Sequence, residues 1–284
     1  MNRKNKKFKE FIFWTSRLYI PILLIIFLPT IVSFLVGGSL TSNEVSNLKS
    51  TNFYIRAFYN VIPNNIAKYI TIGLIVFIGT LASIRKFKTS DVFNDNQTVY
   101  IHDCYKRLWL ASKILGYKKL CLIGVSLPMQ FEVIMNGTFS EFITQSSTVQ
   151  YEIFDGKIEV NTLNEKQQNS TILNVFICDT YDISINSIDI RFRRYPILKI
   201  YSTLVHTKQR YDNPEIVKIV REEMQKAVDQ YDELNLFLST NCLNSEKIIK
   251  GSVAASDRSG FKKITVVQMN ENKVYDDAFI IYES

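Results

Sequence analysis

The chain has 284 residues and a formal net charge of +7, with 46% apolar and 21% charged residues. So many apolar and so few charged residues exclude an intrinsically disordered chain. Two histidines and the absence of a Cys-x-x-Cys pair exclude the common zinc motifs, so we expect no metal and no cofactor. The length fits one or two domains.

The positive charge is concentrated near the N-terminus. Residues 1–96 hold 12 Lys or Arg and four Asp or Glu, whereas residues 97–284 hold 22 and 23. A protein that binds duplex nucleic acid needs a basic surface to displace counterions. Since the larger part of the chain is close to neutral, we expect no duplex nucleic acid partner.

Two apolar segments follow one another in the first 90 residues. The first covers about residues 18–40 and has no charge from Leu18 to Thr41, and the second covers about 64–84. About 20 apolar residues cross a hydrocarbon core of roughly 30 Å, so residues 1–90 are predicted to be a membrane region with two transmembrane helices. The alternatives are a cleaved signal peptide for the first segment and a buried soluble helix for the second.

The flanking Lys and Arg residues predict the orientation. Six of them precede the first segment and three follow the second, whereas the intervening loop has only Lys49 and Arg56. Positive residues stay on the cytoplasmic side, so both termini are expected there. The chain is therefore predicted to be a multi-pass protein of the cell membrane with a lipid bilayer as its partner.

Residues 97–284 are predicted to form a cytoplasmic α/β domain. A helix is expected over about 98–116, followed by an apolar strand over 120–127 and a second helix over 129–145. Residues 149–154 indicate a further strand. Strand, helix and strand in this order predict a βαβ unit with a parallel pair.

The rest of this domain is predicted to form a mixed sheet. Asn213-Pro214-Glu215 has the cap, first-turn proline and acidic residue of a helix start, and the helix is expected to end near Asp232. Several strands in succession favour a mixed or antiparallel arrangement. They are expected over 157–160, 172–178, 183–192, 197–205, 234–239, 261–269 and 274–282.

Two features indicate phosphate binding. The basic cluster Arg191, Arg193, Arg194 and Lys199 would present Arg191 and Arg193 on one side of an extended strand, where guanidinium groups match phosphate geometry. Ser126 lies between a predicted strand and a predicted helix, a position where phosphate often binds. The alternatives are a solvated strand edge or lipid headgroup contact for the cluster, and tight packing for Ser126.

His206-Thr207-Lys208 resembles the His-x-Lys motif of phospholipase D-like enzymes. The resemblance would make His206 the nucleophile and Lys208 a phosphate ligand. However, Asn213 stands where the motif requires aspartate, and Pro214 opens a helix where a strand is expected. We therefore predict no catalytic residue, and keep a membrane-tethered phosphodiesterase or nuclease of degenerate type as the alternative.

Two predicted spans followed by an α/β domain resemble the two-transmembrane effectors of prokaryotic anti-phage systems. Such systems use retrons or cyclic-nucleotide signalling and lead to abortive infection. The resemblance implies that the α/β domain senses a nucleotide signal or a cytosolic protein partner. It also implies that the spans form a homo-oligomer and disrupt the inner membrane. A membrane scaffold that recruits a cytosolic partner is a further alternative.

Overall fold

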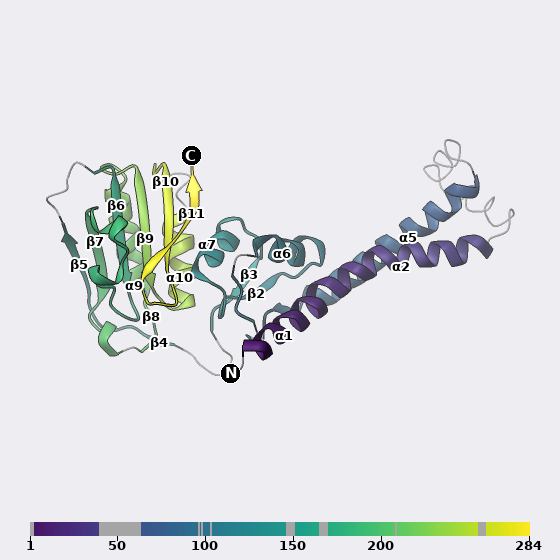
Figure 1. Cartoon of the computed structure of the whole chain (residues 1–284), viewed down its shortest axis with the longest axis horizontal. Helices are drawn as coiled ribbons and strands as arrows, with labels where there is room; N and C mark the ends of the chain where they lie inside the picture. The colour runs from purple at the N-terminus through teal and green to yellow at the C-terminus, as the bar shows by residue number, and fades with distance from the viewer. Residues whose placement is uncertain are drawn as a thin grey trace. The chain divides into compact units, whose positions relative to one another are not determined.

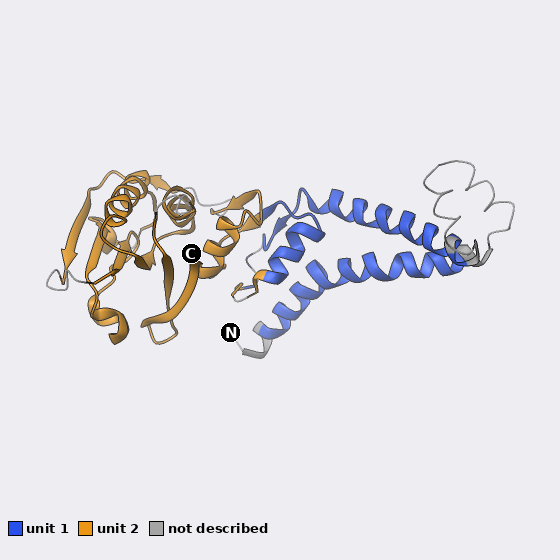
Figure 2. Ribbon diagram, turned by 90° about the horizontal axis from the view of Figure 1, so that it is seen from above, with its two compact units in different colours: residues 1–99, 106–119 blue, residues 100–105, 120–284 orange. Residues whose placement is uncertain are grey.

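A computed structural model describes residues 3–39, 64–95, 97, 99–102, 104–145, 151–164, 170–207, 209–254 and 260–284 (Figure 1). The chain divides into two compact units (Figure 2). The first comprises residues 1–99 and 106–119, and the second comprises residues 100–105 and 120–284. The loop between the two apolar segments, with Lys49 and Arg56, lies outside the described residues.

The first unit is built on two long apolar helices. Helix α1 (Arg3–Trp14) continues through a π-helical turn (Thr15–Tyr19) into α2 (Ile20–Ser39), and α5 (Asn64–Lys88) packs against α2. The apolar windows within Lys7–Val36 and Lys68–Lys88 are long enough to cross a membrane, and only 22% and 6% of them are buried. Such low burial distinguishes them from core helices of a soluble domain.

Small residues bring α2 and α5 close together. The Ser33 hydroxyl donates to the Tyr69 carbonyl, and a Cβ atom at Gly73 would lie 3.7 Å from Ser33. Short side chains at this contact let the two backbones approach, as is common between helices in lipid. The outward side chains of both helices, such as Ile26 and Ile75, are exposed.

An aromatic cluster lies at the base of the two helices. The rings of Phe13 and Trp14 pack on Phe93 in strand β1 (Val92–Phe93), and Phe93 packs on Tyr117. The helix predicted over 98–116 begins later, as α6 (Tyr105–Trp109) followed by a π-helical turn (Leu110–Ile114). The physical reason is that Ile101 forms a parallel bridge with Val125, which holds this segment extended.

The strand–helix–strand order predicted at the start of the second unit is present, with its two strands neighbouring in a three-stranded sheet, but the second strand lies at residues 141–143 and not at 149–154. Strand β2 (Lys119–Cys121) is short, and α7 (Leu127–Met135) ends ten residues earlier than expected because Gly137 takes a left-handed φ of +53°. Residues 141–143 then form strand β3 (Glu141–Ile143). Strand β4 (Glu152–Ile153) pairs in parallel with β8 (Tyr211–Asp212) rather than with the strand near residue 120.

A six-stranded mixed sheet forms the core of the second unit, as predicted. Its strands are β5 (Ile158–Leu163), β6 (Ile172–Cys178), β7 (Ile197–Ser202), β9 (Glu233–Ser239), β10 (Lys263–Met269) and β11 (Tyr275–Glu283). The order is β11-β10-β9-β6-β7-β5, with the four inner strands parallel and the two edge strands antiparallel to their neighbours. The central strands β6 and β9 are buried along almost their whole length, as is typical of parallel strands in the middle of a sheet.

Two helices flank strand β9 in the sequence, one before it and one after it. Helix α9 (Pro214–Ala227) starts where predicted, and the side chain of Asn213 accepts a hydrogen bond from the Ile216 amide at 3.1 Å. It ends at Ala227, five residues before the predicted end. Helix α10 (Cys242–Ile248), continued by a π-helical turn (Ile249–Val253), was not predicted.

The strand predicted over 183–192 is wrong. The segment forms a 3-10 turn (Ile185–Ser187) and a short helix α8 (Ile190–Arg193), which Asp189 caps by accepting from the Arg191 amide. Ile183, Ile188 and Phe192 are buried in a cluster with Phe176 and Phe237. In a strand, every second side chain lies on one face. Ile183 and Ile188 are five residues apart, so a regular strand would place them on opposite faces and could not bury both in this cluster.

Candidate functional site

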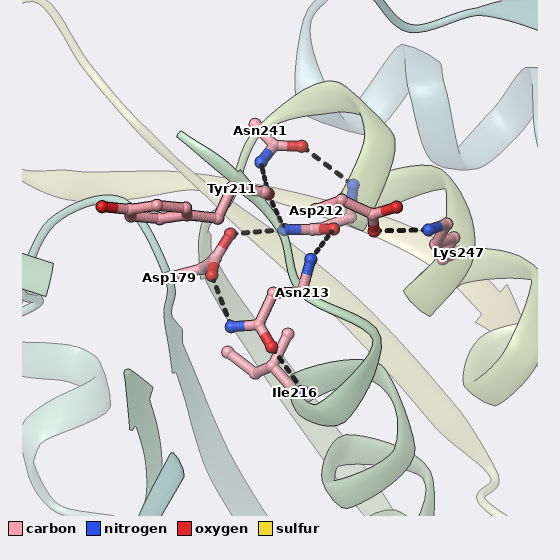
Figure 3. Close-up of polar contacts among 8 residues, drawn as sticks. Asp179, Tyr211, Asp212, Asn213, Ile216, Asn241 and Lys247 are labelled. Atoms are coloured by element: carbon pink, nitrogen blue, oxygen red, sulfur yellow. Dashed lines mark hydrogen bonds and ion pairs between the residues drawn. The ribbon is translucent and has the colours of Figure 1, made fainter. Parts of the chain in front are cut away.

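The carboxyl ends of β6 and β9 meet the N-termini of α9 and α10 in a buried polar network (Figure 3). Asp179, directly after β6, accepts hydrogen bonds from the amide nitrogens of Asn213 at 3.0 Å and Asn244 at 2.7 Å. Asn213 caps α9, and Asn241 caps α10 by accepting from the Asn244 amide. One carboxylate therefore ties both helix starts to the end of a central strand.

The network also includes strand β8. The side-chain amides of Asn241 and Asn244 donate to the Tyr211 carbonyl at 2.7 and 2.9 Å. The Lys247 ammonium forms an ion pair with Asp212 at 2.5 Å. The short pair β4–β8 is thereby fixed to the same edge of the large sheet.

Burial raises the pKa of the Asp179 carboxyl, whose residue is only 5% exposed, and the two amide hydrogen bonds oppose this effect. The nearby Asp212 raises it further. Helix N-termini attract negative charge through their unpaired amides and their dipole. The anion next to α9 and α10 is therefore a carboxylate of the protein itself.

A second polar site, which we call the Lys199 hollow, lies at strands β7 and β5, on the side of β6 away from β9. It has a volume of about 280 Å³ and is lined by Asn161, Leu163, Asp182, Lys199, Tyr201, Val205 and His206. The Lys199 ammonium pairs with Asp182 at 2.6 Å. The Tyr201 hydroxyl donates to Glu159, which raises the pKa of Tyr201, and accepts from Asn161 at 3.2 Å. The structure thus brings two residues singled out from the sequence, Lys199 and His206, into one hollow.

The three arginines of the predicted cluster contact their own surroundings. Arg191 binds Asp189 at 3.0 Å and the Asp276 carbonyl at 3.1 Å. Arg193 donates to the carbonyls of Ile188 and Asn186. Arg194 donates to the Tyr195 hydroxyl at 2.7 Å. The extended geometry expected for Arg191 and Arg193 is wrong because both lie in α8; their binding of phosphate stays a prediction.

Ser126 lines a larger hollow that we call the α7–β11 groove. The groove has a volume of about 1020 Å³ and lies between α7, the β10–β11 hairpin and residues 100–102. Ser126 is the N-cap residue of α7, although its side chain forms no capping hydrogen bond. The rings of Tyr100 and His102 lie tilted against each other with centroids 5.9 Å apart, and burial raises the pKa of Tyr100.

The His-x-Lys motif is described in part. His206 lies in a 3-10 turn (Val205–Thr207) after β7, and Lys208 lies outside the described residues. Asp212 is paired with Lys247, and Asn213 caps a helix. Within the described residues, no group of three or more His, Cys, Asp or Glu side chains is placed to hold a metal ion.

Sequence reasoning missed the Asp179 network and the contribution of Asp182 and Tyr201. A signal was present, because polar residues follow both apolar runs directly: Asp179-Thr180 after β6, and Thr240-Asn241 after β9. Side chains at the carboxyl ends of parallel strands gather at one edge of a sheet.

The family is identified by a match over nearly the whole chain. Residues 3–281 match the model of the SMODS- and Ubiquitin system-associated 2TM effector domain, SUa-2TM. The chain belongs to this family. It is a two-transmembrane effector domain of anti-phage defence, which confirms the resemblance inferred from the sequence. The family and the two apolar helices indicate association with a membrane.

Other comparisons give weaker similarities. No curated protein matches the chain. Structures of the Acinetobacter baumannii Cap4 SAVED/CARF-domain containing receptor with the cyclic trinucleotides 2'3'3'-cAAA and 3'3'3'-cAAA match with TM-scores of 0.41 and 0.43 at 15% identity. The matches cover 63% of this SUa-2TM chain and 42% and 43% of the receptor chains, so the chain spans less than half of the receptor's length. At these TM-scores, the structural similarity does not support the assignment of a ligand.

Proposed function

We propose that this SUa-2TM chain senses a phosphate-bearing nucleotide signal with its α/β unit and disrupts the inner membrane with its two apolar helices. The observation that carries the proposal is the low burial of the helices, 22% and 6% over their apolar windows, in a chain of an effector family. Exposed apolar surface of this extent needs lipid or further copies of the helices to cover it. The basic residues that end α5 support an orientation with both termini in the cytoplasm.

The helices carry small residues that favour association into a homo-oligomer. Apart from the backbone of α5 itself, no atom of the described residues lies within 4 Å of a Cβ atom placed at Gly79, so this face of α5 is open for close approach. A groove next to it is lined by Leu24, Leu28, Thr80 and Ser83, among others. Helices in lipid associate through such small residues, because van der Waals contact replaces the hydrophobic effect there.

The Lys199 hollow is our candidate for the signal site. Lys199 is paired with Asp182, and the two side chains are 18% and 43% exposed, so an incoming phosphate can compete with Asp182 for the ammonium. The Tyr201 ring next to Lys199 offers a surface on which a base stacks. The Asp179 network makes the neighbouring edge less suitable, because a carboxylate already lies there.

Expression of the full chain in bacteria, with a membrane-potential dye as the readout, tests the membrane step. Ile26→Arg places a charge in α2 that costs roughly 2.5–3.5 kcal/mol on insertion scales, and we expect it to prevent depolarisation. Ile26→Leu is the matched control and should depolarise like the parent chain. Depolarisation by Ile26→Arg at equal protein level contradicts the proposal.

His206→Ala separates this proposal from a tethered enzyme. A membrane-disrupting effector needs no nucleophile, so a loss of depolarisation in His206→Ala that accompanies a dependence on Ile26 would reflect the Lys199 hollow, which His206 also lines. Killing that depends on His206 but not on Ile26 would favour the phosphodiesterase or nuclease.

A further inference from the structure

Strand β11 leaves one edge of the large sheet open over part of its length. At its start, Ile188 forms a bridge with Tyr275, and the Asp189 amide donates to the Tyr275 carbonyl at 3.0 Å. Arg191 then donates to the Asp276 carbonyl. Beyond Asp276, β10 is the single strand of the described chain that pairs with β11.

The open part is short and regular. The pairing of β10 with β11 shifts register between Gln268 and Met269 and again between Ile264 and Thr265. Between these irregularities lies the segment 277–280, in which Phe279 and Ile280 are 40% and 55% exposed. An unpaired edge presents a row of amide and carbonyl groups that accepts another strand.

The α7–β11 groove runs along this edge and is acidic. Glu132, Glu271 and Asp277 line it, and none of the described residues that line it is Lys or Arg. Within the described part of the chain, no ion pair involves Glu271 or Asp277. Ser126, only 4% exposed, also lines the groove, and its hydroxyl forms no capping hydrogen bond.

We propose that the open edge of β11 and the α7–β11 groove bind an extended basic segment of another protein by strand addition. The added strand would pair with residues 277–280, place apolar side chains beside Ile280 on one face of the sheet, and direct Lys or Arg toward Asp277 on the other face. A second copy of β11 fits less well. The strand carries Asp276, Asp277 and Glu283 and no basic residue, so self-pairing would oppose like charges.

Fluorescence anisotropy with the full chain in a neutral detergent tests this proposal. The probe is a labelled eight-residue peptide of alternating Lys and Val, compared with an alternating Glu and Val peptide. Two further Lys–Val peptides are N-methylated at alternate residues, one in each register. We expect the Lys–Val peptide to bind and the Glu–Val peptide to fail. One methylated register should lose about five- to a hundredfold in affinity, since it lacks the backbone donors that face β11.

Asp277→Asn combined with Glu271→Gln should weaken the Lys–Val peptide by about two- to thirtyfold, the range expected for two partly exposed ion pairs. The matched control is Glu222→Gln with Asp229→Asn, two exposed acids outside the groove, which should leave binding unchanged. Equal affinity for both peptides, or no effect of methylation in either register, overturns the proposal. A dimer that Ile280→Lys dissociates, with no peptide bound, would assign the edge to a second copy and also overturn it.

Discussion

Replacing Asp179 by Ala should loosen the starts of α9 and α10 together. The substitution removes the acceptor of the Asn213 side-chain amide, which then has no partner among the described residues. Asn244 also loses a hydrogen bond, but it keeps the Tyr211 carbonyl at 2.9 Å. The free-energy cost of the substitution is therefore larger at Asn213 than at Asn244.

These contacts set the expected magnitude. An unsatisfied buried donor costs about 1–3 kcal/mol, and a lost hydrogen bond with a second partner retained costs about 0.5–1.5 kcal/mol. The variant also avoids the burial of a carboxylate, which offsets part of this loss. We expect a net destabilisation of about 1–4 kcal/mol at the two helix starts.

Hydrogen exchange of the full chain in detergent measures this effect locally. In Asp179→Ala, amide exchange should rise by about five- to a hundredfold in residues 214–217 and by about two- to tenfold in residues 242–245. Lys226→Ala, which removes an exposed ion pair with Glu223 on the same helix, is the control and should change exchange little. Unchanged exchange in both segments, or an equal rise across the whole sheet, would refute a local link through Asp179.

Three further predictions follow from single sites. The pKa of Asp179 is raised in the folded chain, so the folded state binds this proton more tightly than the unfolded state. The stability that the parent chain has relative to Asp179→Asn should therefore fall as pH rises from about 3.9 toward the folded pKa, in paired denaturation curves. Lys199→Met should weaken an identified nucleotide ligand about tenfold or more by calorimetry, whereas Lys226→Ala, which removes an exposed cation outside the hollow, should not. Gly137→Ala should destabilise the chain by about 1 kcal/mol in thermal unfolding, because the left-handed φ of +53° is strained although space is free.

The sequence predicted those elements whose signals are local. Asn213-Pro214-Glu215 fixes the start of α9 through a cap, a proline without an amide hydrogen and an acid at the helix dipole. The runs 172–178 and 234–239 are apolar except for Asn174, Asn235 and Ser239, and both form buried strands. In each case, the residues that determine the element lie within it or next to it.

The predictions from the sequence failed where contacts between residues far apart in the chain determine the structure. Residues 183–192 alternate apolar and polar side chains like a strand, yet Ile190 is 78% exposed while Ile188 is fully buried. The cap at Asp189 and the packing of Phe192 on Phe237 outweigh the alternation. The Asp179 network is a further case, because its hydrogen bonds join residues 34 and 65 positions apart. Sequence spacing does not encode such distances.

Our two proposals place two partners of opposite charge at opposite edges of the large sheet. At the β5 and β7 edge, the Lys199 hollow offers an ammonium and an aromatic ring, which suits an anionic signal. At the β11 edge, the groove offers carboxylates and an unpaired strand, which suits a basic segment. Between them, Asp179 keeps the anion position at two helix starts occupied, so a phosphate meets fewer competing sites on this unit. We therefore propose that a signal and a protein partner bind the same sheet without competing for one surface.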